Sequence, residues 1–188
     1  MKRVGVLAVQ GAFERHGQVV CSLGHRAVLV RSPAELADLD GMILPGGESS
    51  VQLAMLDRLS LSEPLTAFVQ SGKPVLATCA GLILAARSVQ HPEQRSFGWI
   101  DLSVARNAYG RQLDSFEAES DEEAKLPLVF IRAPRILSHG PTVEVLARHR
   151  GEPVLVRDGN LTCATFHPEL TDDLRVHRAV FGETAAQP

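Results

Sequence analysis

Hydrophobic positions in the first half of the chain alternate between two periods. Near-continuous apolar runs, which are typical of buried parallel strands, occupy residues 4–9, 26–30, 41–44 and 74–78. Apolar residues at helical spacing predict helices at 12–23, 50–59, 63–70 and 80–88, and Gly24 suits the C-terminal cap of the first. Strands joined by helical crossovers predict a parallel sheet covered on both faces.

The second half has short apolar runs with little helical pattern between them. These runs predict strands at 101–105, 113–119, 128–131, 142–147, 153–157 and 161–166. Because the connections are short, we expect them to be antiparallel additions to the sheet. A helix is predicted at 172–181 and a flexible tail at 183–188. The whole chain, 1–188, therefore reads as one α/β domain with a central, mostly parallel sheet and helices on both faces.

Composition excludes several classes of function. A net charge of −3 and a pI near 6.2 give no basic surface for nucleic acid. No apolar run is long enough for a membrane span. Three cysteines, an odd number without regular spacing, do not form a disulfide framework, so we expect a cytoplasmic protein. The histidines lack metal-ligand spacing, and we predict neither a metal nor another cofactor.

Cys79 is the first candidate for chemistry. It follows a predicted strand and has two small neighbours, Ala80 and Gly81. A nucleophile on a strand-to-helix turn adopts strained backbone angles and needs small neighbours. The N-terminal N–H groups of the next helix would stabilise its thiolate. We therefore predict a nucleophile at Cys79, whereas Cys21 and Cys163, inside a predicted helix and strand, are expected to be buried as small hydrophobic residues.

His167, Pro168 and Glu169 supply the partners that a thiol nucleophile needs. His167 comes directly after a predicted strand, and Pro168 restricts the backbone there. Glu169 can accept the second imidazole N–H, which fixes the tautomer of His167. Since such triads assemble in space and not in sequence, their distance from Cys79 along the chain is no obstacle. We predict a catalytic triad of Cys79, His167 and Glu169.

The loop 44–50, Leu-Pro-Gly-Gly-Glu-Ser-Ser, links the third strand to a helix. Two consecutive glycines let a backbone N–H turn toward a ligand at low steric cost. The amides of Gly47 and Ala80 would then form an oxyanion hole. The simpler alternative is a tight turn in which Ser49 or Ser50 is the helix N-cap.

The motifs together resemble the class I, triad-type glutamine amidotransferases, and among them the glutaminase subunits of pyridoxal 5'-phosphate synthase. The matching blocks lie at 5–12, 44–49, 106–112, 114–117, 130–134 and 167–171. The block at 106–112, Arg-Asn-Ala-Tyr-Gly-Arg-Gln, is the most specific, because generic class I glutaminases lack it. The resemblance covers nearly the whole chain and implies a three-layer fold.

The resemblance implies hydrolysis of L-glutamine to L-glutamate and ammonia. It also implies a partner, a synthase subunit in a large hetero-oligomer, to which the ammonia passes directly. An arginine can clamp the α-carboxylate, and Glu48 or main-chain carbonyls can receive the ammonium group. Arg132 is alternatively a structural ion-pair partner. The implied glutamine-binding residues are Gly47, Glu48, Ser49, Arg106, Ile131 and Arg132.

Two departures from the family pattern leave the triad untouched. Ala77 stands where the family usually has glycine, and Ser50 and Val51 replace the usual threonines. Gln10 and Gly11 are either interface or ammonia-gate residues or a simple strand-to-helix turn. The alternative functions are a glutaminase serving another synthase, a non-catalytic docking subunit and, more remotely, a cysteine hydrolase or glyoxalase-like protein.

Overall fold

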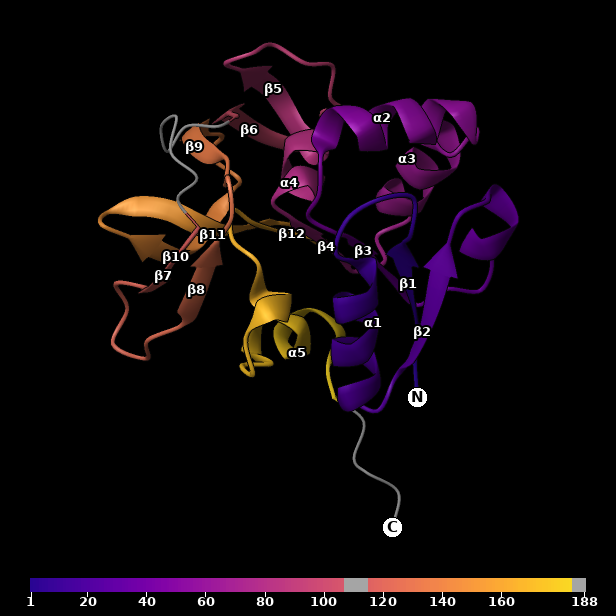
Figure 1. Ribbon diagram of the computed structural model, residues 1–188, viewed down its shortest axis with the longest axis horizontal. Helices are drawn as coiled ribbons and strands as arrows, with labels where there is room; N and C mark the ends of the chain where they lie inside the picture. The colour runs from indigo at the N-terminus through magenta and orange to yellow at the C-terminus, as the bar shows by residue number, and fades with distance from the viewer. Residues whose placement is uncertain (107–114, 184–188) are drawn as a thin grey trace.

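The computed structural model describes residues 1–106 and 115–183. Within these residues the central sheet has seven strands in the order β10-β11-β12-β4-β3-β1-β2 (Figure 1). Five neighbouring strands are parallel: β2 (Arg26–Val30), β1 (Arg3–Leu7), β3 (Gly41–Leu44), β4 (Val75–Thr78) and β12 (Leu161–Ala164). At one edge the sheet continues with two antiparallel strands, β11 (Glu152–Asp158) and β10 (Glu144–His149).

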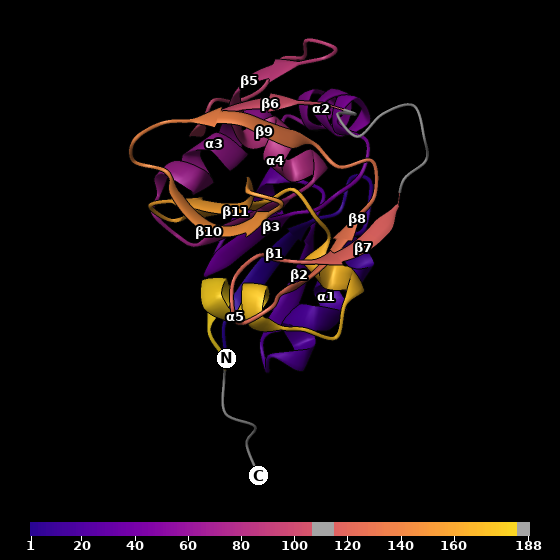
Figure 2. The same cartoon turned by 90° about the vertical axis from the view of Figure 1, so that its left-hand side faces the viewer.

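Helices cover both faces of this sheet (Figures 1 and 2). One face carries α1 (Phe13–Ser22) and α5 (Arg175–Phe181), and the other carries α2 (Ser49–Arg58), α3 (Ser62–Gln70) and α4 (Ala80–Ala85). Short 3-10 turns occur at η1 (Pro33–Leu36) and η2 (Pro168–Leu170). Two small sheets complete the described part: β5 (Ala86–Gln90), β6 (Ile100–Ala105) and β9 (Arg135–His139) form one, and β7 (Phe116–Glu119) and β8 (Pro127–Phe130) form the other.

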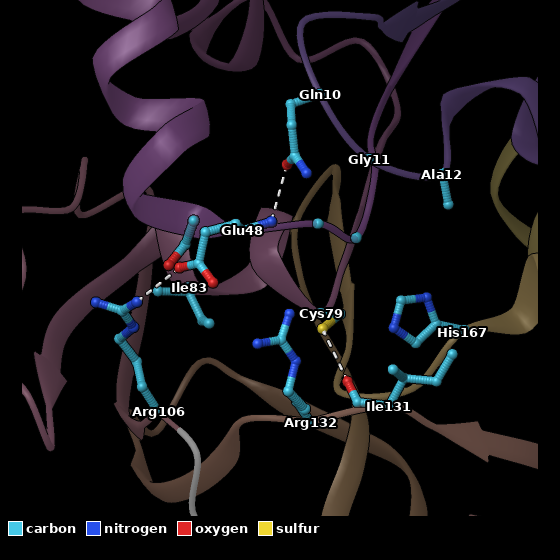
Figure 3. A pocket seen from close by; sticks show the side chains of 13 residues that line it. Gln10, Gly11, Ala12, Glu48, Cys79, Ile83, Arg106, Ile131, Arg132 and His167 are labelled. Carbon is cyan, nitrogen blue, oxygen red and sulfur yellow. Dashed lines mark hydrogen bonds and ion pairs between the residues drawn. The ribbon is translucent and has the colours of Figure 1, made fainter. Parts of the chain in front are cut away.

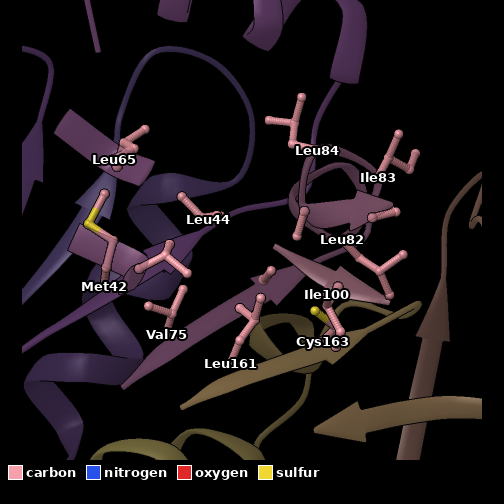
Figure 4. Packing of buried hydrophobic residues seen from close by; sticks show 14 of the residues in the cluster. Met42, Leu44, Leu65, Val75, Leu82, Ile83, Leu84, Ile100, Leu161 and Cys163 are labelled. Atoms are coloured by element: carbon pink, nitrogen blue, oxygen red, sulfur yellow. The ribbon is translucent and has the colours of Figure 1, made fainter. Parts of the chain in front are cut away.

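Alternating side chains of the central strands fill two separate hydrophobic cores. In β4, Val75 and Ala77 pack on the side of α2, α3 and α4, whereas Leu76 packs on the side of α1 and α5. Figure 4 shows the first core, in which Val75 lies with residues such as Leu44 and Leu161 from the neighbouring strands. Because successive side chains of a strand point to opposite faces, a near-continuous apolar run is what a strand covered on both faces requires.

The predicted fold class is confirmed: the protein is α/β with a mixed, mostly parallel central sheet and helices on both faces. The ends of the predicted elements shift by a few residues, but the strand–helix alternation of the first half is present. Of the six strands predicted in the second half as antiparallel additions, three join the central sheet as β10, β11 and β12. The pairings of β10 with β11 and of β11 with β12 are antiparallel as expected, whereas β12 pairs parallel with β4. The other three became β6, β7 and β8, which lie in the two small sheets, so the prediction that all six extend the central sheet was wrong.

Three further details differ from the sequence-based prediction. The helix expected to reach Ser88 ends at Ala85, because the next residues pair with β6 as strand β5. Strand β9 was not predicted. Cys163 is buried as expected, but Cys21 is exposed on α1. The predicted tail, 183–188, falls outside the described residues except for Glu183, which pairs with Arg178. Among the helices described, none has the length and apolarity needed to cross a bilayer.

Candidate active site

Four loops meet at one edge of the central sheet, because the parallel strands β1, β3, β4 and β12 all end there. Leu44 of β3 lies beside Ala77 of β4, and Ala164 of β12 lies beside Thr78. The segments that follow these strands therefore converge, although they are far apart in sequence. Ligands of open α/β sheets bind at this carboxyl edge.

Cys79 occupies the predicted strand-to-helix turn, as the N-cap residue of α4. Its backbone angles, φ 48° and ψ −102°, lie in the left-handed half of conformational space. Such a conformation costs a non-glycine residue about 1–3 kcal/mol and is found at functional sites. The backbone N–H of Cys79 donates to the Ala164 carbonyl at 2.8 Å, which ties the turn to β12. Its sulfur lies 3.9 Å from the Ile131 carbonyl oxygen.

His167 faces the sulfur of Cys79 from the end of β12 (Figure 3). Its Nδ1 lies 2.8 Å from Oε1 of Glu169, and its backbone N–H donates to the Val129 carbonyl at 2.8 Å. Nε2 is buried and has no hydrogen-bond partner of good geometry among the described residues. Because Glu169 occupies Nδ1, Nε2 is the nitrogen that remains to exchange a proton in the pocket. The structure thus brings the three predicted triad residues together.

Charge stabilises a protonated His167. Burial would lower the pKa of this imidazole, but its interactions with Cys79 and Glu169 outweigh burial and raise the pKa to about 10. Burial would likewise raise the pKa of the Glu169 carboxyl, but the adjacent His16 and His167 more than offset it, and the pKa is lowered. Since a raised histidine pKa and a lowered carboxyl pKa both favour the charged forms, the pair is set up as imidazolium and carboxylate.

The glycine loop packs directly against the histidine. A Cβ added at Gly46 would overlap Cε1 of His167 and would stand 3.3 Å from Cβ of Cys79. The loop after β1 packs on the other side: Gly11 has φ 103°, and a Cβ there would overlap the Gly46 carbonyl oxygen. That carbonyl accepts a hydrogen bond from the Ala12 N–H at 3.1 Å. Both positions therefore require glycine, because the backbone lies too close to its neighbours to leave room for a side chain.

Two glutamines hold this pair of loops together, and the sequence did not single out the second. Gln10 Oε1 accepts from the Glu48 N–H at 2.8 Å. Gln52 Nε2 donates to the carbonyls of Gln10 at 3.0 Å and Pro45 at 3.2 Å. The available signal was that Gln52 shares its helix face with Ser49 and Leu56, a face that is buried. A buried amide on such a face usually has a hydrogen-bond partner nearby, as Gln52 Nε2 has here.

A cavity of about 190 Å³ opens between these loops (Figure 3). Of the predicted site residues, Glu169 lies behind His167, Ala80 begins α4, and the others line the cavity. The lining residues are Gln10, Gly11, Ala12, Gly46, Gly47, Glu48, Ser49, Cys79, Ile83, Arg106, Ile131, Arg132 and His167.

Opposite charges lie at the wall of the cavity away from His167. Arg106 Nη2 lies 3.0 Å from Glu48 Oε1 (Figure 3). Arg132 is exposed at the cavity with φ 45°, and it forms no ion pair with a described residue, which gives its structural ion-pair alternative no support. Residues 107–112 of the most specific sequence block lie outside the described part of the chain.

The serines after Glu48 do not cap α2 as the simpler alternative expected. Glu48 itself holds the N-cap position, and α2 begins at Ser49. The Ser49 hydroxyl donates to Gln94 Oε1 at 3.0 Å, and the Ser50 hydroxyl donates to Glu48 Oε1 at 3.0 Å. The hydroxyl groups thus fix neighbouring side chains and not the helix terminus. In the described residues, no group of three histidine, cysteine or acidic side chains could hold a metal ion.

Comparisons with known proteins show the family of this chain. A family model described as the SNO glutamine amidotransferase family matches residues 6–185. Pyridoxal 5'-phosphate synthase subunit PdxT of Shouchella clausii is 46% identical over 180 residues, which cover 94% of this chain and 92% of that protein. The subunit of the same name from Thermotoga neapolitana is 47% identical and covers 94% and 96%. A solved structure titled "Crystal structure of glutamine amidotransferase" is 41% identical with a TM-score of 0.88, over 94% of this chain and 96% of that one.

These matches extend over the same span as the motifs. The match to the family model, residues 6–185, includes the glycine loop and the His-Pro-Glu segment. The resemblance inferred from the sequence blocks is thereby confirmed. The chain belongs to the SNO glutamine amidotransferase family.

Proposed function

We propose that this chain is the glutaminase subunit of a pyridoxal 5'-phosphate synthase. It hydrolyses L-glutamine to L-glutamate and ammonia, and the ammonia passes to a partner synthase subunit in a large hetero-oligomer. The observation that carries the proposal is the strained turn at Cys79 facing the His167–Glu169 pair across a small cavity. The name shared by the relatives supports the choice of synthase.

The reaction begins with the thiolate of Cys79 and the imidazolium of His167. The sulfur attacks the side-chain amide carbon of glutamine, a C–S bond forms, and the carbonyl electrons move to oxygen. As the tetrahedral intermediate collapses, the C–N bond breaks and the nitrogen takes the proton of His167 Nε2, leaving as ammonia. Neutral His167 then removes a proton from water, which attacks the thioester. Breaking the C–S bond yields glutamate and restores the thiolate.

The oxyanion is assigned to the backbone amides of Gly47 and Ala80. Ala80 is the first residue of α4, and the first N–H groups of a helix have no partner within the helix. Gly47 lies between Gly46, which contacts His167, and Glu48, whose N–H already binds Gln10. One such donor typically contributes about 2.7–4 kcal/mol to lowering the barrier.

The charged wall of the cavity is suited to the amino-acid end of glutamine. Arg106 and Arg132 supply guanidinium groups for the α-carboxylate, and Glu48 supplies a carboxylate for the α-ammonium group. The Glu48–Arg106 ion pair holds both groups in place before glutamine arrives. Ser49 and the Ile131 backbone complete the contacts that we assign to glutamine binding.

Substitution of Arg106 by methionine tests the assignment of the charged wall. Because the interaction is made in both the ground state and the transition state, KM should rise roughly 10- to 100-fold while kcat changes little. The matched control is Arg87→Met, which breaks the exposed ion pair between Arg87 of β5 and Asp101 of β6 and should leave both constants unchanged. Steady-state kinetics of ammonia release measure the two constants. A fall in kcat at unchanged KM would contradict a binding role.

The function itself is tested by ammonia release from glutamine with and without the synthase subunit of the same organism. We expect ammonia release when the two subunits are mixed, and co-purification of the two subunits. A different synthase in the purified complex would favour the rival biosynthetic pathway. No release in either condition would favour a docking subunit.

Three free thiols suit the reducing cytoplasm, where we place the protein.

A further inference from the structure

A buried polar cluster lies behind the triad, on the α1 and α5 side of the sheet. His16 of α1, Thr78 of β4 and His177 of α5 are completely buried. None of the three belongs to the chemistry described above. Polar side chains are costly to bury unless they are hydrogen-bonded, so the cluster calls for a physical role.

The cluster reaches the triad through Glu169. His16 Nε2 lies 3.3 Å from Glu169 Oε2 and 3.2 Å from the Thr78 hydroxyl oxygen. The other carboxylate oxygen, Oε1, binds His167 at 2.8 Å. Among the described residues, Glu169 Oε2 accepts no hydrogen bond of good geometry. The ring nitrogen Nε2 of His16 lies beside this oxygen. Two histidines from different elements therefore lie beside opposite oxygens of one carboxylate: His167 is hydrogen-bonded to Oε1, and His16 is 3.3 Å from Oε2.

The second buried histidine fixes the tautomer of the first. Burial lowers the pKa of His177 to about 3 and also lowers the pKa of His16, so both rings are neutral near pH 7. His177 Nδ1 has no partner among the described residues, whereas its Nε2 lies 2.9 Å from His16 Nδ1. A buried N–H without an acceptor is costly, which places the His177 proton on Nε2. His16 then accepts at Nδ1 and carries its own proton on Nε2, which is hydrogen-bonded to the Thr78 hydroxyl and lies 3.3 Å from Glu169 Oε2.

We propose that His16 is a positioning residue of the active site, which keeps Glu169 ionised and aimed at His167. The proposal rests on the triad assigned above. The ionisable groups that surround His16 are Glu169, His167 and His177. Without the N–H of His16, the negative charge of the buried Glu169 carboxylate is less well stabilised. Glu169 then supports the His167 imidazolium less well, so the ion pair between Cys79 and His167 becomes less stable.

The test uses two variants of His16 that place a hydrogen-bond donor at different positions of the former imidazole ring. The side-chain nitrogen of glutamine can take the place of imidazole Nε2, whereas that of asparagine corresponds to Nδ1 and cannot reach Glu169. We therefore expect His16→Asn to lower kcat about 10-fold at unchanged KM, and His16→Gln to restore most of the activity. Ammonia release is measured with the synthase subunit present.

A second readout separates positioning from a structural role. The rate of alkylation of Cys79 by iodoacetamide is followed against pH, with Cys79 identified by peptide mass. In His16→Asn the half-maximal rate should shift upward by about one pH unit, and in His16→Gln it should return toward wild type. The matched control is His25→Gln, which alters a buried histidine that contacts Gly182 and the backbone of Lys2 instead of the triad. It should leave the pH dependence unchanged.

The proposal would be overturned if His16→Asn and His16→Gln had the same kcat and the same pH dependence of alkylation, whether both match wild type or both are impaired. A purely structural role does not depend on which position carries the hydrogen-bond donor. Failure of the triad itself has a different signature. In that case, wild-type Cys79 would react no faster than the exposed Cys21 at any pH.

Discussion

Replacing Cys79 with alanine should abolish the release of ammonia from glutamine, with a fall of at least about 10⁴-fold. The reason is that no other thiol reaches the cavity: Cys163 is buried in β12 and Cys21 is exposed on α1. The substitution removes only the sulfur, so the fold should persist. The measurement is ammonia release in the presence of the synthase subunit, with thermal unfolding as the check on folding.

The control for this variant is Cys21→Ala, which removes an exposed thiol far along α1 from the cavity. It should release ammonia at the wild-type rate. Release within tenfold of wild type by the folded Cys79→Ala protein would exclude Cys79 as the nucleophile.

The second large effect is expected from Gly46→Ala. The added methyl group would overlap Cε1 of His167 and approach Cβ of Cys79, so the imidazole has to move. A displacement of about 1 Å at a reacting group typically costs 10²-fold in rate, and we expect kcat to fall by about that factor. Glutamine binding at Glu48 and Arg106, on the far wall, should change much less. Steady-state kinetics separate the two effects.

Gly17→Ala is the matched control for Gly46→Ala. Gly17 lies within α1, and a Cβ there meets only ordinary van der Waals contact with Ala27. This substitution should leave kcat unchanged and raise the free energy of unfolding by about 0.5–1 kcal/mol, because glycine is a poor helix former. Full activity in Gly46→Ala would show that His167 does not depend on the close approach of the glycine loop.

The sequence predicted those strands whose conformation can be recognised from their own residues, without knowledge of the strand they pair with. The runs that became β1, β3 and β4 are apolar throughout, which is sufficient to indicate buried parallel strands. The residues after Ala85 were assigned to a helix, since Ala86 continues the same apolar pattern. Their strand conformation depends on pairing with β6, which no local pattern shows. Strand β9 depends on the same partner.

In the candidate site, too, residues marked by a local motif were predicted and residues defined by contacts between distant segments were not. The sequence predicted that Cys79, His167 and Glu169 lie together, because turn chemistry and the His-Pro-Glu segment mark them. The supporting residues were missed, because their contacts join distant segments: His16 meets Thr78 and His177 across three elements. A signal did exist, since His16 shares the buried face of α1 with Val19 and Val20. A polar residue on such a face usually has a buried partner.

The most direct test of the account is to map where a reactive glutamine analogue attaches. A diazoketone analogue keeps the α-amino and α-carboxylate groups of glutamine and carries an electrophilic carbon in place of the amide. Incubated with the complex of both subunits, it should label Cys79 alone, and excess glutamine should protect that residue. Label on Cys21 or Cys163 with none on Cys79 would contradict the account.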